Sequence, residues 1–299
     1  MTMSRFEFPR FLELLEEQRV TVVVGAPPIA AGLAHHPLVE RRDLSSLELI
    51  VSGGAPLGAD VQARLAARFP HAAVGQGWGM TETTVGATGP DRDRGTVAGS
   101  VGRVLPNTEL RVVDTETGAD LGSGERGELW VRGPQVMEGY LNRPQATAEM
   151  LDGDGWLRTG DLGTVDTAGN VFVVDRLKEL IKVSGFQVAP AELEALLATH
   201  PRVADAAVVG RPDERRGEAP VATVVPRGEL DARELIAWVA ERVSPYKRIA
   251  AVRFADSIPR TPSGKVLRRL LMPNPEQPAE PALKRRRAAS GPRPATGAS

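Results

Sequence analysis

The first 95 residues alternate short apolar runs with amphipathic segments, and this alternation limits the fold more than any other feature of the chain. The runs VTVVVG and LELIVSGG are rich in branched residues and end in glycine, which is typical of buried strands. The segments PRFLELLEEQ, PPIAAGLAHH and LGADVQARLAARF have helical character, and the second opens with proline, which favours a helix start. The alternation predicts a parallel α/β sheet, whose strands need cover on both faces.

Two further segments follow, each with a different pattern of predicted secondary structure. Residues 96–175 contain the strand-like runs TELRVVD, GELWVRG and NVFVVDR between turn-forming segments, and we expect a small β-barrel-like region there. Residues 176–272 combine the helical segments PAELEALLATH and DARELIAWVAERV with the strand-like VADAAVVG and APVATVVP, which indicates a compact α+β module. The predicted fold class is therefore α/β plus α+β.

Residues 273–299 are rich in proline, alanine and arginine, have no periodicity and are expected to be disordered. The KRRR run in this tail allows a nucleic-acid patch, but we favour a solvated run of charge.

The composition excludes several classes of function. The net charge is −1, so we expect no nucleic-acid partner. No apolar run approaches the length of a membrane span, and the start lacks the core of a signal peptide. The chain has no cysteine, which excludes disulfides and thiolate zinc sites, and its four histidines lack metal-ligand spacing. These features fit a cytoplasmic protein.

Lysine is scarce, which draws attention to the positions that keep it. The chain has five lysines against 32 arginines, and they are Lys178, Lys182, Lys247, Lys265 and Lys284. Lysine is a compact charge on a flexible stem that reaches a single oxygen, whereas arginine is a planar fork. We expect chemical roles for Lys182 and Lys265, while Lys247 fits an ordinary surface residue equally well.

Two glycine-containing segments in the first part suit a nucleotide. SGGAPLG follows a predicted strand, and Gly53, Gly54 and Ala55 would let the backbone approach a flat ligand, although a tight turn needs glycine anyway. In GQGWGMTET, the residues Gly77, Trp78 and Gly79 suit a wall for an aromatic ring. Thr81 offers a hydroxyl to a phosphate, and Glu82 offers an oxygen to Mg²⁺. The alternatives are a surface carboxylate and a core tryptophan.

Three downstream residues extend this set. Asp161 in RTGD is expected at the end of a turn, where its carboxylate would accept two hydroxyl hydrogen bonds from a ribose diol. Arg176 follows a predicted strand, and its fork would reach the same sugar or a phosphate. Lys265, on the loop RTPSGK, would neutralise charge that develops in a transition state.

Six motifs in this order carry a family resemblance over residues 4–271. They are SGGAPLG, GQGWGMTET, GELWVRGPQVMEGYLNRPQAT, GWLRTGD, VDRLKELIKVSGFQVAPAELE and PRTPSGKVLRR. The chain resembles the acyl- and aryl-CoA ligases of the adenylate-forming, AMP-binding superfamily, in the style of 4-coumarate–CoA ligase. The resemblance implies an ATP-dependent acid–thiol ligase with a small carboxylic acid as substrate, Mg²⁺ as cofactor and CoA as co-substrate.

The resemblance also implies a role for each matching residue. Gly53, Gly54, Ala55 and Trp78, with Gly77 and Gly79 beside them, would border adenine. Thr81 would touch phosphate, Glu82 would hold Mg²⁺, and Asp161 with Arg176 would bind ribose. Lys178 would lie at a hinge between a partial AMP-binding domain (1–175) and a lid domain (176–272). Lys265 would serve adenylation, and Lys182, Ser184 and Gly185 would serve thioester formation.

The chain departs from the family pattern at one place. The family's Ser/Thr/Gly-rich phosphate loop, which ends in Pro-Lys-Gly, does not occur in the 299 residues, and neither does G-x-x-x-x-G-K-[ST]. We therefore expect an N-terminally truncated ligase whose missing part comes from a complementing N-terminal half or from an upstream start. The alternative is an inactive remnant or a nucleotide-binding module without ligase activity.

Overall fold

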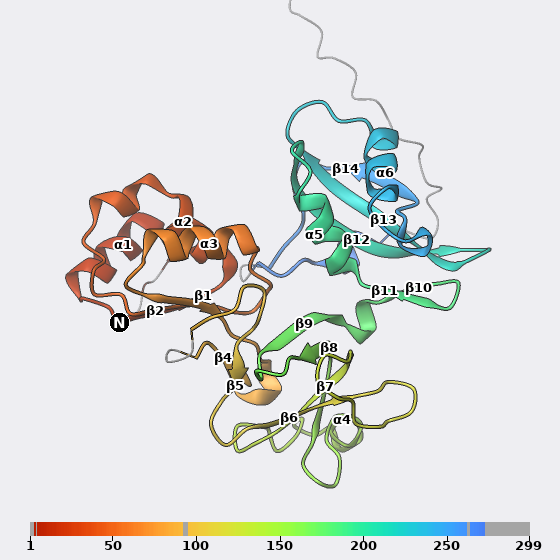
Figure 1. The fold of residues 1–299 in the computed structure, drawn as a ribbon, viewed down its shortest axis with the longest axis horizontal. Helices are drawn as coiled ribbons and strands as arrows, with labels where there is room; N and C mark the ends of the chain where they lie inside the picture. The colour runs from red at the N-terminus through yellow and green to blue at the C-terminus, as the bar shows by residue number, and fades with distance from the viewer. Residues whose placement is uncertain (1–2, 4, 92–94, 262–263, 273–299) are drawn as a thin grey trace, which may run out of the picture.

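The computed structural model describes residue 3 and residues 5–91, 95–261 and 264–272. The predicted disordered tail, 273–299, lies outside the described residues. Three lobes follow one another along the described chain (Figure 1). They are the N-terminal sheet with its helices, a middle antiparallel sheet, and a C-terminal unit that begins at residue 177.

The N-terminal sheet confirms the predicted α/β alternation. Its parallel strands stand in the order β1-β2-β3, and they are β1 (Val22–Gly25), β2 (Leu49–Ser52) and β3 (Ala73–Gln76). The helices are α1 (Phe8–Glu17), α2 (Pro27–His35), the short η1 (Pro37–Arg41) and α3 (Ala59–Arg68). Proline at the first turn of α1 and α2 suits a helix start because its missing N–H is not needed there. Leu12, Leu33, Ile50 and Leu65 are fully buried between helices and strands.

Among the described residues, helices cover only one face of β1 and β2. Figure 1 shows α1, α2 and α3 on the same side of β1 and β2. Val23 of β1 points into that core and is 5% exposed, whereas its neighbours Val22 and Val24 are 41% and 70% exposed. Because side chains alternate along a strand, the two exposed valines mark a second apolar face that is uncovered at β1.

The middle lobe is an open antiparallel sheet in the order β6-β7-β8-β9. Its strands are β6 (Glu109–Val113), β7 (Gly127–Arg132), β8 (Leu157–Val165) and β9 (Val171–Arg176), and the helix α4 (Pro144–Met150) precedes β8. The short pair β4 (Thr88–Gly89) and β5 (Arg103–Val104) and the turn η2 (Thr81–Thr83) join it to the N-terminal sheet. Leu129 and Val131 of β7 are fully buried, and Trp130 between them points to the other face.

The prediction that Asp161 ends a turn was wrong. Asp161 lies inside β8, where it pairs with Arg176 of β9. The glycines of RTGDLG mark irregular pairing rather than a chain reversal. Gly160 has a φ of +69°. The β7–β8 register shifts between Glu128 and Trp130, and the β8–β9 register shifts between Leu162 and Gly163. Such bulges bend a strand and aim single side chains without ending it.

The outer face of the middle sheet carries a ladder of guanidinium groups and indole rings. The Arg111 guanidinium lies 4.6 Å from the Trp130 ring centre and 4.5 Å from that of Trp156. Arg158 extends the ladder over Trp130, and Arg132 extends it over Trp156. Each cation over an indole face is worth about 0.5–1 kcal/mol at an exposed site, so the ladder stabilises this face of the sheet.

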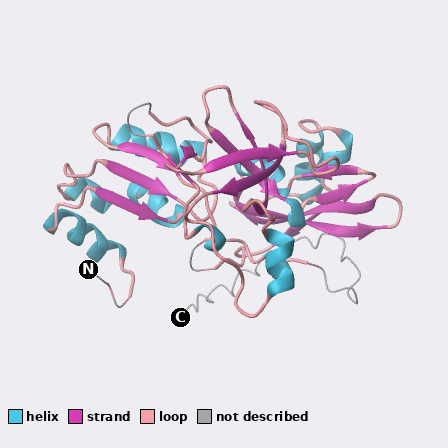
Figure 2. Ribbon diagram, turned by 90° about the horizontal axis from the view of Figure 1, so that it is seen from below, coloured by secondary structure: helices cyan, strands magenta, loops and turns pink. Residues whose placement is uncertain are grey.

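The C-terminal unit is α+β, as predicted (Figure 2). Its sheet runs β11-β10-β13-β12, with β14 parallel to β13. The elements are η3 (Leu177–Glu179) at its start, β10 (Ile181–Val183), β11 (Phe186–Val188), α5 (Pro190–Ala198), β12 (Val203–Asp213), β13 (Gly217–Pro226), α6 (Ala232–Ala240), η4 (Pro245–Lys247), β14 (Ala251–Phe254) and η5 (Arg268–Leu270). Leu193, Leu197 and Leu235 of the two helices are fully buried against this sheet.

The last strand of the middle sheet caps the first helix of the C-terminal unit. Ala189, the residue at the start of α5, has no side chain that caps the helix. Asp175 of β9 supplies the acceptor instead, because its Oδ2 accepts from the Ala191 amide at 3.1 Å. Leu162, Leu180 and Ala189 form a small apolar cluster beside this contact. The two lobes are therefore joined by packing and by a helix cap.

Within the described ranges, none of the helices combines the length and apolar character that crossing a bilayer requires.

Candidate active site

Glycine-rich loops meet at the carboxyl edge of the N-terminal sheet. The Gly53 amide, directly after β2, donates to the Gly25 carbonyl at 2.9 Å, and the Gly77 amide, after β3, donates to Ser52 at 2.9 Å. Gly54 has a φ of +84°, and a Cβ placed on it would meet no atom within 4 Å. Ala55 is half-buried beside it. This edge of an open parallel sheet is where ligands bind in α/β proteins.

Trp78, Asp161 and Arg176 form one connected group beside these loops. The Trp78 Nε1 donates to Asp161 Oδ2 at 2.7 Å, and the Arg176 Nε lies 2.9 Å from Asp161 Oδ1. The Asp161 side chain is 3% exposed, whereas that of Arg176 is 50% exposed. Despite the nearby cation, Asp161 Oδ1 has no hydrogen-bond donor with acceptable geometry in the described structure. A buried carboxylate oxygen with an open acceptor position suits a hydroxyl donor from a ligand.

Burial dominates the electrostatics of this carboxylate. It raises the pKa of Asp161, and the Arg176 charge and the Trp78 N–H oppose the rise without cancelling it. Ionisation of Asp161 therefore costs the fold stability. Carboxyl groups with a perturbed pKa are typical of sites that bind a ligand.

The GMTET segment forms a tight turn that presents Thr81 and Glu82. A Cβ on Gly79 would lie 2.2 Å from the Val85 carbonyl oxygen, so only glycine fits there. The turn ends in Thr84 and Val85, which have φ values of 46° and 83°. Positive φ at a branched residue is strained, and such strain gathers at ligand sites. Thr81 is exposed and Glu82 is half-buried.

Tyr140 is a neighbour of Glu82 that sequence reasoning missed. Its hydroxyl donates to Glu82 Oε1 at 2.6 Å, and this bond raises the pKa of Tyr140 to about 12. The Met137 amide donates to the Glu82 carbonyl at 2.8 Å, which ties the segment before α4 to the same turn. The GYLNRP motif was recognised, but no local pattern shows that its tyrosine reaches a carboxylate 58 residues away.

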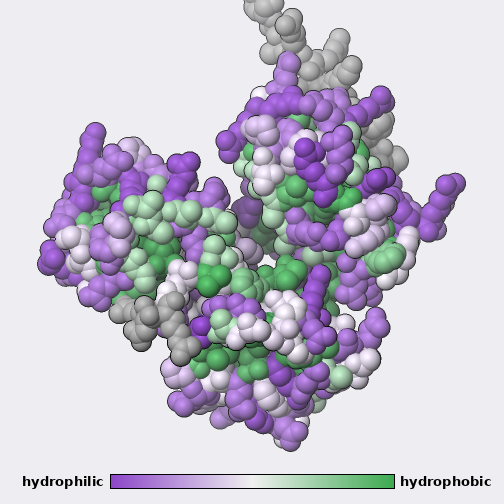
Figure 3. Space-filling view, viewed as in Figure 1, coloured by the Kyte–Doolittle hydropathy of each residue, from purple (hydrophilic) through white to green (hydrophobic). Residues whose placement is uncertain are grey.

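The Lys265 hairpin reaches the N-terminal sheet from the C-terminal unit. A Cβ on the neighbouring Gly264 would lie 3.3 Å from Pro28 Cδ, so this loop packs against the first turn of α2. That turn follows β1 at the same edge of the sheet as the Gly53 loop. Figure 3 shows the surface hollowed between these two lobes. Lys265 itself is exposed.

The other lysines occupy different surroundings. Lys182 and the turn residues Ser184 and Gly185 are exposed on the β10–β11 hairpin, where φ is 50° and 85° at the two turn residues. Lys178 is exposed in η3, at the start of the C-terminal unit and directly after the middle sheet. Lys247 is ion-paired, because its Nζ lies 2.6 Å and 2.8 Å from the two carboxylate oxygens of Glu192.

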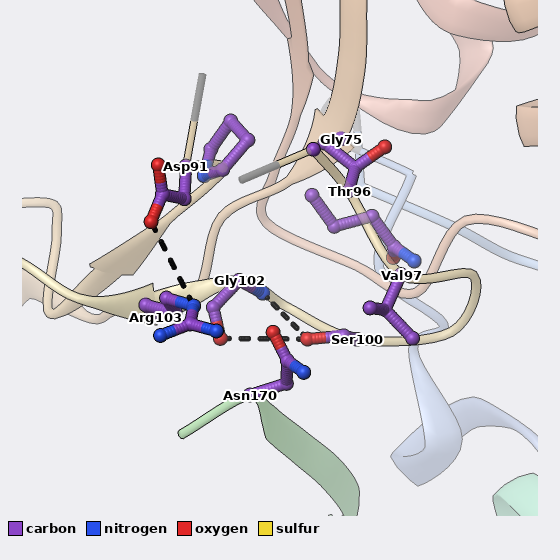
Figure 4. Close-up of a pocket in the computed structure, with 11 residues that line it drawn as sticks. Gly75, Asp91, Thr96, Val97, Ser100, Gly102, Arg103 and Asn170 are labelled. Atoms are coloured by element: carbon purple, nitrogen blue, oxygen red, sulfur yellow. Dashed lines mark hydrogen bonds and ion pairs between the residues drawn. The ribbon is translucent and has the colours of Figure 1, made fainter. Parts of the chain in front are cut away.

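One small pocket is lined in part by Gly75 and Gln76, the two residues directly before Gly77. It is lined by Gly75, Asp91, Ser100, Arg103 and Asn170 among others, and its free volume of about 10 Å³ is the size of one water molecule (Figure 4). No predicted site residue lines it. The candidate site is therefore the open edge of the sheet rather than this pocket. Within the described ranges, no three acidic or histidine side chains gather as a metal site, and Glu82 stands as a single carboxylate.

Comparison with known proteins matches two family models to this chain. The model described as AMP-binding enzyme covers residues 1–141, and that of the AMP-binding enzyme C-terminal domain covers residues 192–265. A 4-coumarate-CoA ligase from Narcissus pseudonarcissus is 49% identical over 273 residues, which are 89% of this chain and 48% of that protein. The chain thus spans about half the length of the curated relatives it matches.

Solved structures share the fold. ATP-bound MatB from Rhodopseudomonas palustris superposes with a TM-score of 0.83 at 34% identity, over 90% of this chain and 53% of that one. An o-succinylbenzoate CoA synthetase from Bacillus subtilis, in complex with its acyl-adenylate intermediate, superposes with a TM-score of 0.79 at 31% identity. That match covers 94% of this chain and 56% of the synthetase.

Proposed function

The chain belongs to the family of AMP-binding enzymes, and we propose that it carries the AMP side and the lid of an ATP-dependent carboxylic acid–CoA ligase. The observation that supports this most directly is the group of Trp78, Asp161 and Arg176. A buried carboxylate with one open oxygen, a neighbouring cation and glycine loops beside it make a site for a nucleoside with a phosphate.

The residues suit the AMP half of ATP. Asp161 Oδ1 would accept from a ribose hydroxyl, with Arg176 beside it. Gly53, Gly54 and Ala55 would lie along the adenine, whereas the Trp78 ring is buried in the core of the middle sheet with Leu129 and Val131. Because the glycines lack side chains, a flat base could approach their backbone closely.

Glu82 and Thr81 suit the phosphate end. A single carboxylate is enough for Mg²⁺ when phosphate oxygens and waters supply the remaining ligands, and the cation would neutralise phosphate charge during transfer. The Tyr140 hydroxyl already bonds to one Glu82 oxygen and would orient the carboxylate. The Thr81 hydroxyl is exposed and available to donate to a phosphate oxygen.

The proposed reaction has two steps. In the first, a substrate carboxylate oxygen attacks the α-phosphorus of ATP, the bond to the bridging oxygen breaks, and pyrophosphate leaves. In the second, the CoA thiol loses its proton to solvent, its sulfur attacks the acyl carbon, the bond from that carbon to the phosphate oxygen breaks, and AMP leaves. Lys265 would stabilise charge in the first step. Lys182, Ser184 and Gly185 would serve the second step after the C-terminal unit has turned about Lys178.

The uncovered face of the N-terminal sheet supports a further part of the proposal. Parallel sheets are covered on both faces, and Val22 and Val24 are left exposed here. We propose that a complementing N-terminal half packs on this face and supplies the pyrophosphate-side loop. If no such part exists, the Asp161 group favours the second candidate function, a nucleotide-binding module without ligase activity.

The test separates nucleotide binding from turnover. The chain alone should bind AMP but release pyrophosphate slowly with any aryl or fatty acid, because losing one transition-state donor typically costs about 10²–10³ in rate. Robust pyrophosphate release by the 299-residue chain would contradict the need for a complementing half.

A second experiment uses a protein that contains the upstream part. Lys265→Ala should slow adenylate formation and spare thioester formation from preformed acyl-adenylate, and Gly185→Ala should do the reverse. Lys247→Ala is the matched control, because its amine is already paired with Glu192. Equal loss of both steps in Lys265→Ala would refute the assigned division of labour.

A further inference from the structure

The hairpin that carries Lys265 is closed by its own backbone. The Thr261 amide donates to the Lys265 carbonyl at 2.8 Å, and the Gly264 amide donates to the Thr261 carbonyl at 2.8 Å. The Lys265 amide donates to the Thr261 hydroxyl at 3.1 Å. Gly264 is buried with a φ of +87°, a conformation that favours glycine. These bonds shape the hairpin but do not fix its direction relative to the rest of the C-terminal unit.

A guanidinium group adds a polar link between the hairpin and the sheet of the C-terminal unit, beside the packing of Val266 against the apolar cluster that includes Ala207 and Val209 of β12. Arg260 Nη1 donates to the Gly264 carbonyl at 2.9 Å. The other nitrogens face Asp205 of β12, with Nη2 at 2.8 Å from Oδ1 and Nε at 3.3 Å from Oδ2. Asp205 lies at the irregularity in the β12–β13 pairing, and its Oδ1 also accepts from the Ala206 amide at 2.9 Å. The carboxylate is therefore itself held in place.

The consequence of this contact is geometric rather than energetic. The Arg260 and Asp205 side chains are 36% and 38% exposed, and exposed ion pairs add little to stability. The carbonyl that Arg260 holds, however, belongs to the peptide that leads directly into Lys265. The same residue, Gly264, packs against Pro28 at the edge of the N-terminal sheet. Holding this carbonyl therefore helps to set the direction in which the hairpin meets that edge.

We propose that Arg260, held by Asp205, is a positioning residue that sets the Lys265 amine toward the nucleotide site. The role of Lys265 in phosphoryl chemistry rests on the proposed function, but the positioning itself does not. Lysine in place of Arg260 would keep the charge, yet it could not span both carboxylate oxygens and the Gly264 carbonyl, because it lacks the planar fork.

The first test is limited proteolysis of the full chain with lysyl endopeptidase, following cleavage after Lys265. Cleavage after Lys178, Lys182 and Lys247 serves as an internal reference. Arg260→Met and Asp205→Asn should speed cleavage after Lys265 by about fivefold or more, because a local opening of the hairpin becomes easier. Arg260→Lys should be intermediate. Arg202→Met, which breaks the similarly exposed pair with Glu234 in the same unit, is the matched control and should change nothing.

The second test asks whether the amine is presented to the nucleotide. In the wild-type chain, ATP should protect Lys265 from acetylation by an amine reagent. Arg260→Met should lose this protection while its Kd for ATP and its unfolding midpoint stay as in the wild type, a combination that a purely structural role would not produce.

The outcomes separate the two hypotheses. Unchanged cleavage after Lys265 in both Arg260→Met and Asp205→Asn would overturn the positioning role, as would retained protection in Arg260→Met with ATP bound. If ATP binds to neither protein, the proposed function fails, and the cleavage rates still decide whether Arg260 positions the hairpin.

Discussion

Replacing Asp161 by asparagine should weaken nucleotide binding and leave the ligand-free protein as stable as before or more so. The carboxylate is 3% exposed, and burial raises its pKa. A raised pKa means that the folded protein holds this proton more tightly than the unfolded chain does. Ionised Asp161 therefore destabilises the fold, fully so above its raised pKa, and this cost disappears as the pH falls toward the ordinary aspartate value. Asparagine removes the charge and keeps an oxygen for the Trp78 N–H.

The expected magnitude follows from the contacts. The Arg176 partner is half exposed, so losing the ion pair costs at most about 1 kcal/mol. Weakening the Trp78 bond from a charged to a neutral acceptor costs about another 1 kcal/mol. Relief from burying a charge, which in proteins costs several kcal/mol per ion, outweighs both. We expect a change in stability between zero and about +2 kcal/mol, or a rise in Tm of up to roughly 4–8 °C.

Binding should change in the opposite direction. A hydrogen bond to a charged acceptor is worth about 1.5–3 kcal/mol, so the loss for a ribose hydroxyl corresponds to a Kd for AMP at least about tenfold weaker. Differential scanning fluorimetry with and without AMP measures both quantities on one sample. A clear drop in the ligand-free Tm, or an AMP-induced shift equal to that of the wild type, would refute the reasoning. Arg176→Gln, which keeps the buried carboxylate and removes its partner, should lower the ligand-free Tm and serves as the opposite control.

Three further predictions test other parts of the structure. Gly79→Ala should lower the free energy of unfolding in urea by about 2–4 kcal/mol, because its Cβ would lie 2.2 Å from a carbonyl oxygen. Gly53→Ala, whose Cβ would lie 3.5 Å from the nearest atom, should lower it by less than about 1 kcal/mol, and similar losses in the two variants would contradict the packing at Gly79. Glu82→Gln should lower the pKa of Tyr140 from about 12 toward the ordinary value near 10. The alkaline absorbance of tyrosinate, followed in a Tyr246→Phe background, measures this pKa, and an unchanged titration would mean that the bond from the Tyr140 hydroxyl to Glu82 does not form in solution. Limited proteolysis should leave residues 176–272 as the resistant core and cut residues 1–95 first, because residues 1–95 expose Val22 and Val24 of β1. Equal resistance of both parts would show that another surface covers these valines in solution.

Much of the fold could be predicted because its signals are local. The helices α2 and α5 begin at prolines that the sequence displays, and the strands β1 and β2 are short branched runs that end at glycine or directly before it. Asp161 was misplaced for a related reason. Glycine marks both turns and bulges, and only the pairing partners of β8, which lie far away in sequence, decide between the two.

In the candidate site, too, the local signals could be predicted from the sequence and the long-range contacts could not. Trp78, Asp161 and Arg176 were each singled out from the sequence, but their direct contact joins residues 83 positions apart. Tyr140 and Asp205 gave no local signal, because a tyrosine or aspartate becomes part of a site only through the partner that the fold brings to it. Periodicity and turn chemistry describe residues that are neighbours along the chain, whereas these contacts join residues that are far apart in sequence.

The cap that Asp175 places on α5 links a helix end to the arrangement of two lobes. Helix α5 has no capping side chain of its own, so a rotation that carries it away from β9 would leave its first amides without this acceptor. Helix caps are worth about 0.5–2 kcal/mol, which corresponds to a bias of roughly two- to thirtyfold toward the arrangement in which the cap is made. The Asp175 carboxylate, which lies outside the candidate site, therefore favours the present position of the C-terminal unit. The free energy of this preference is small enough for ligand binding to reverse it.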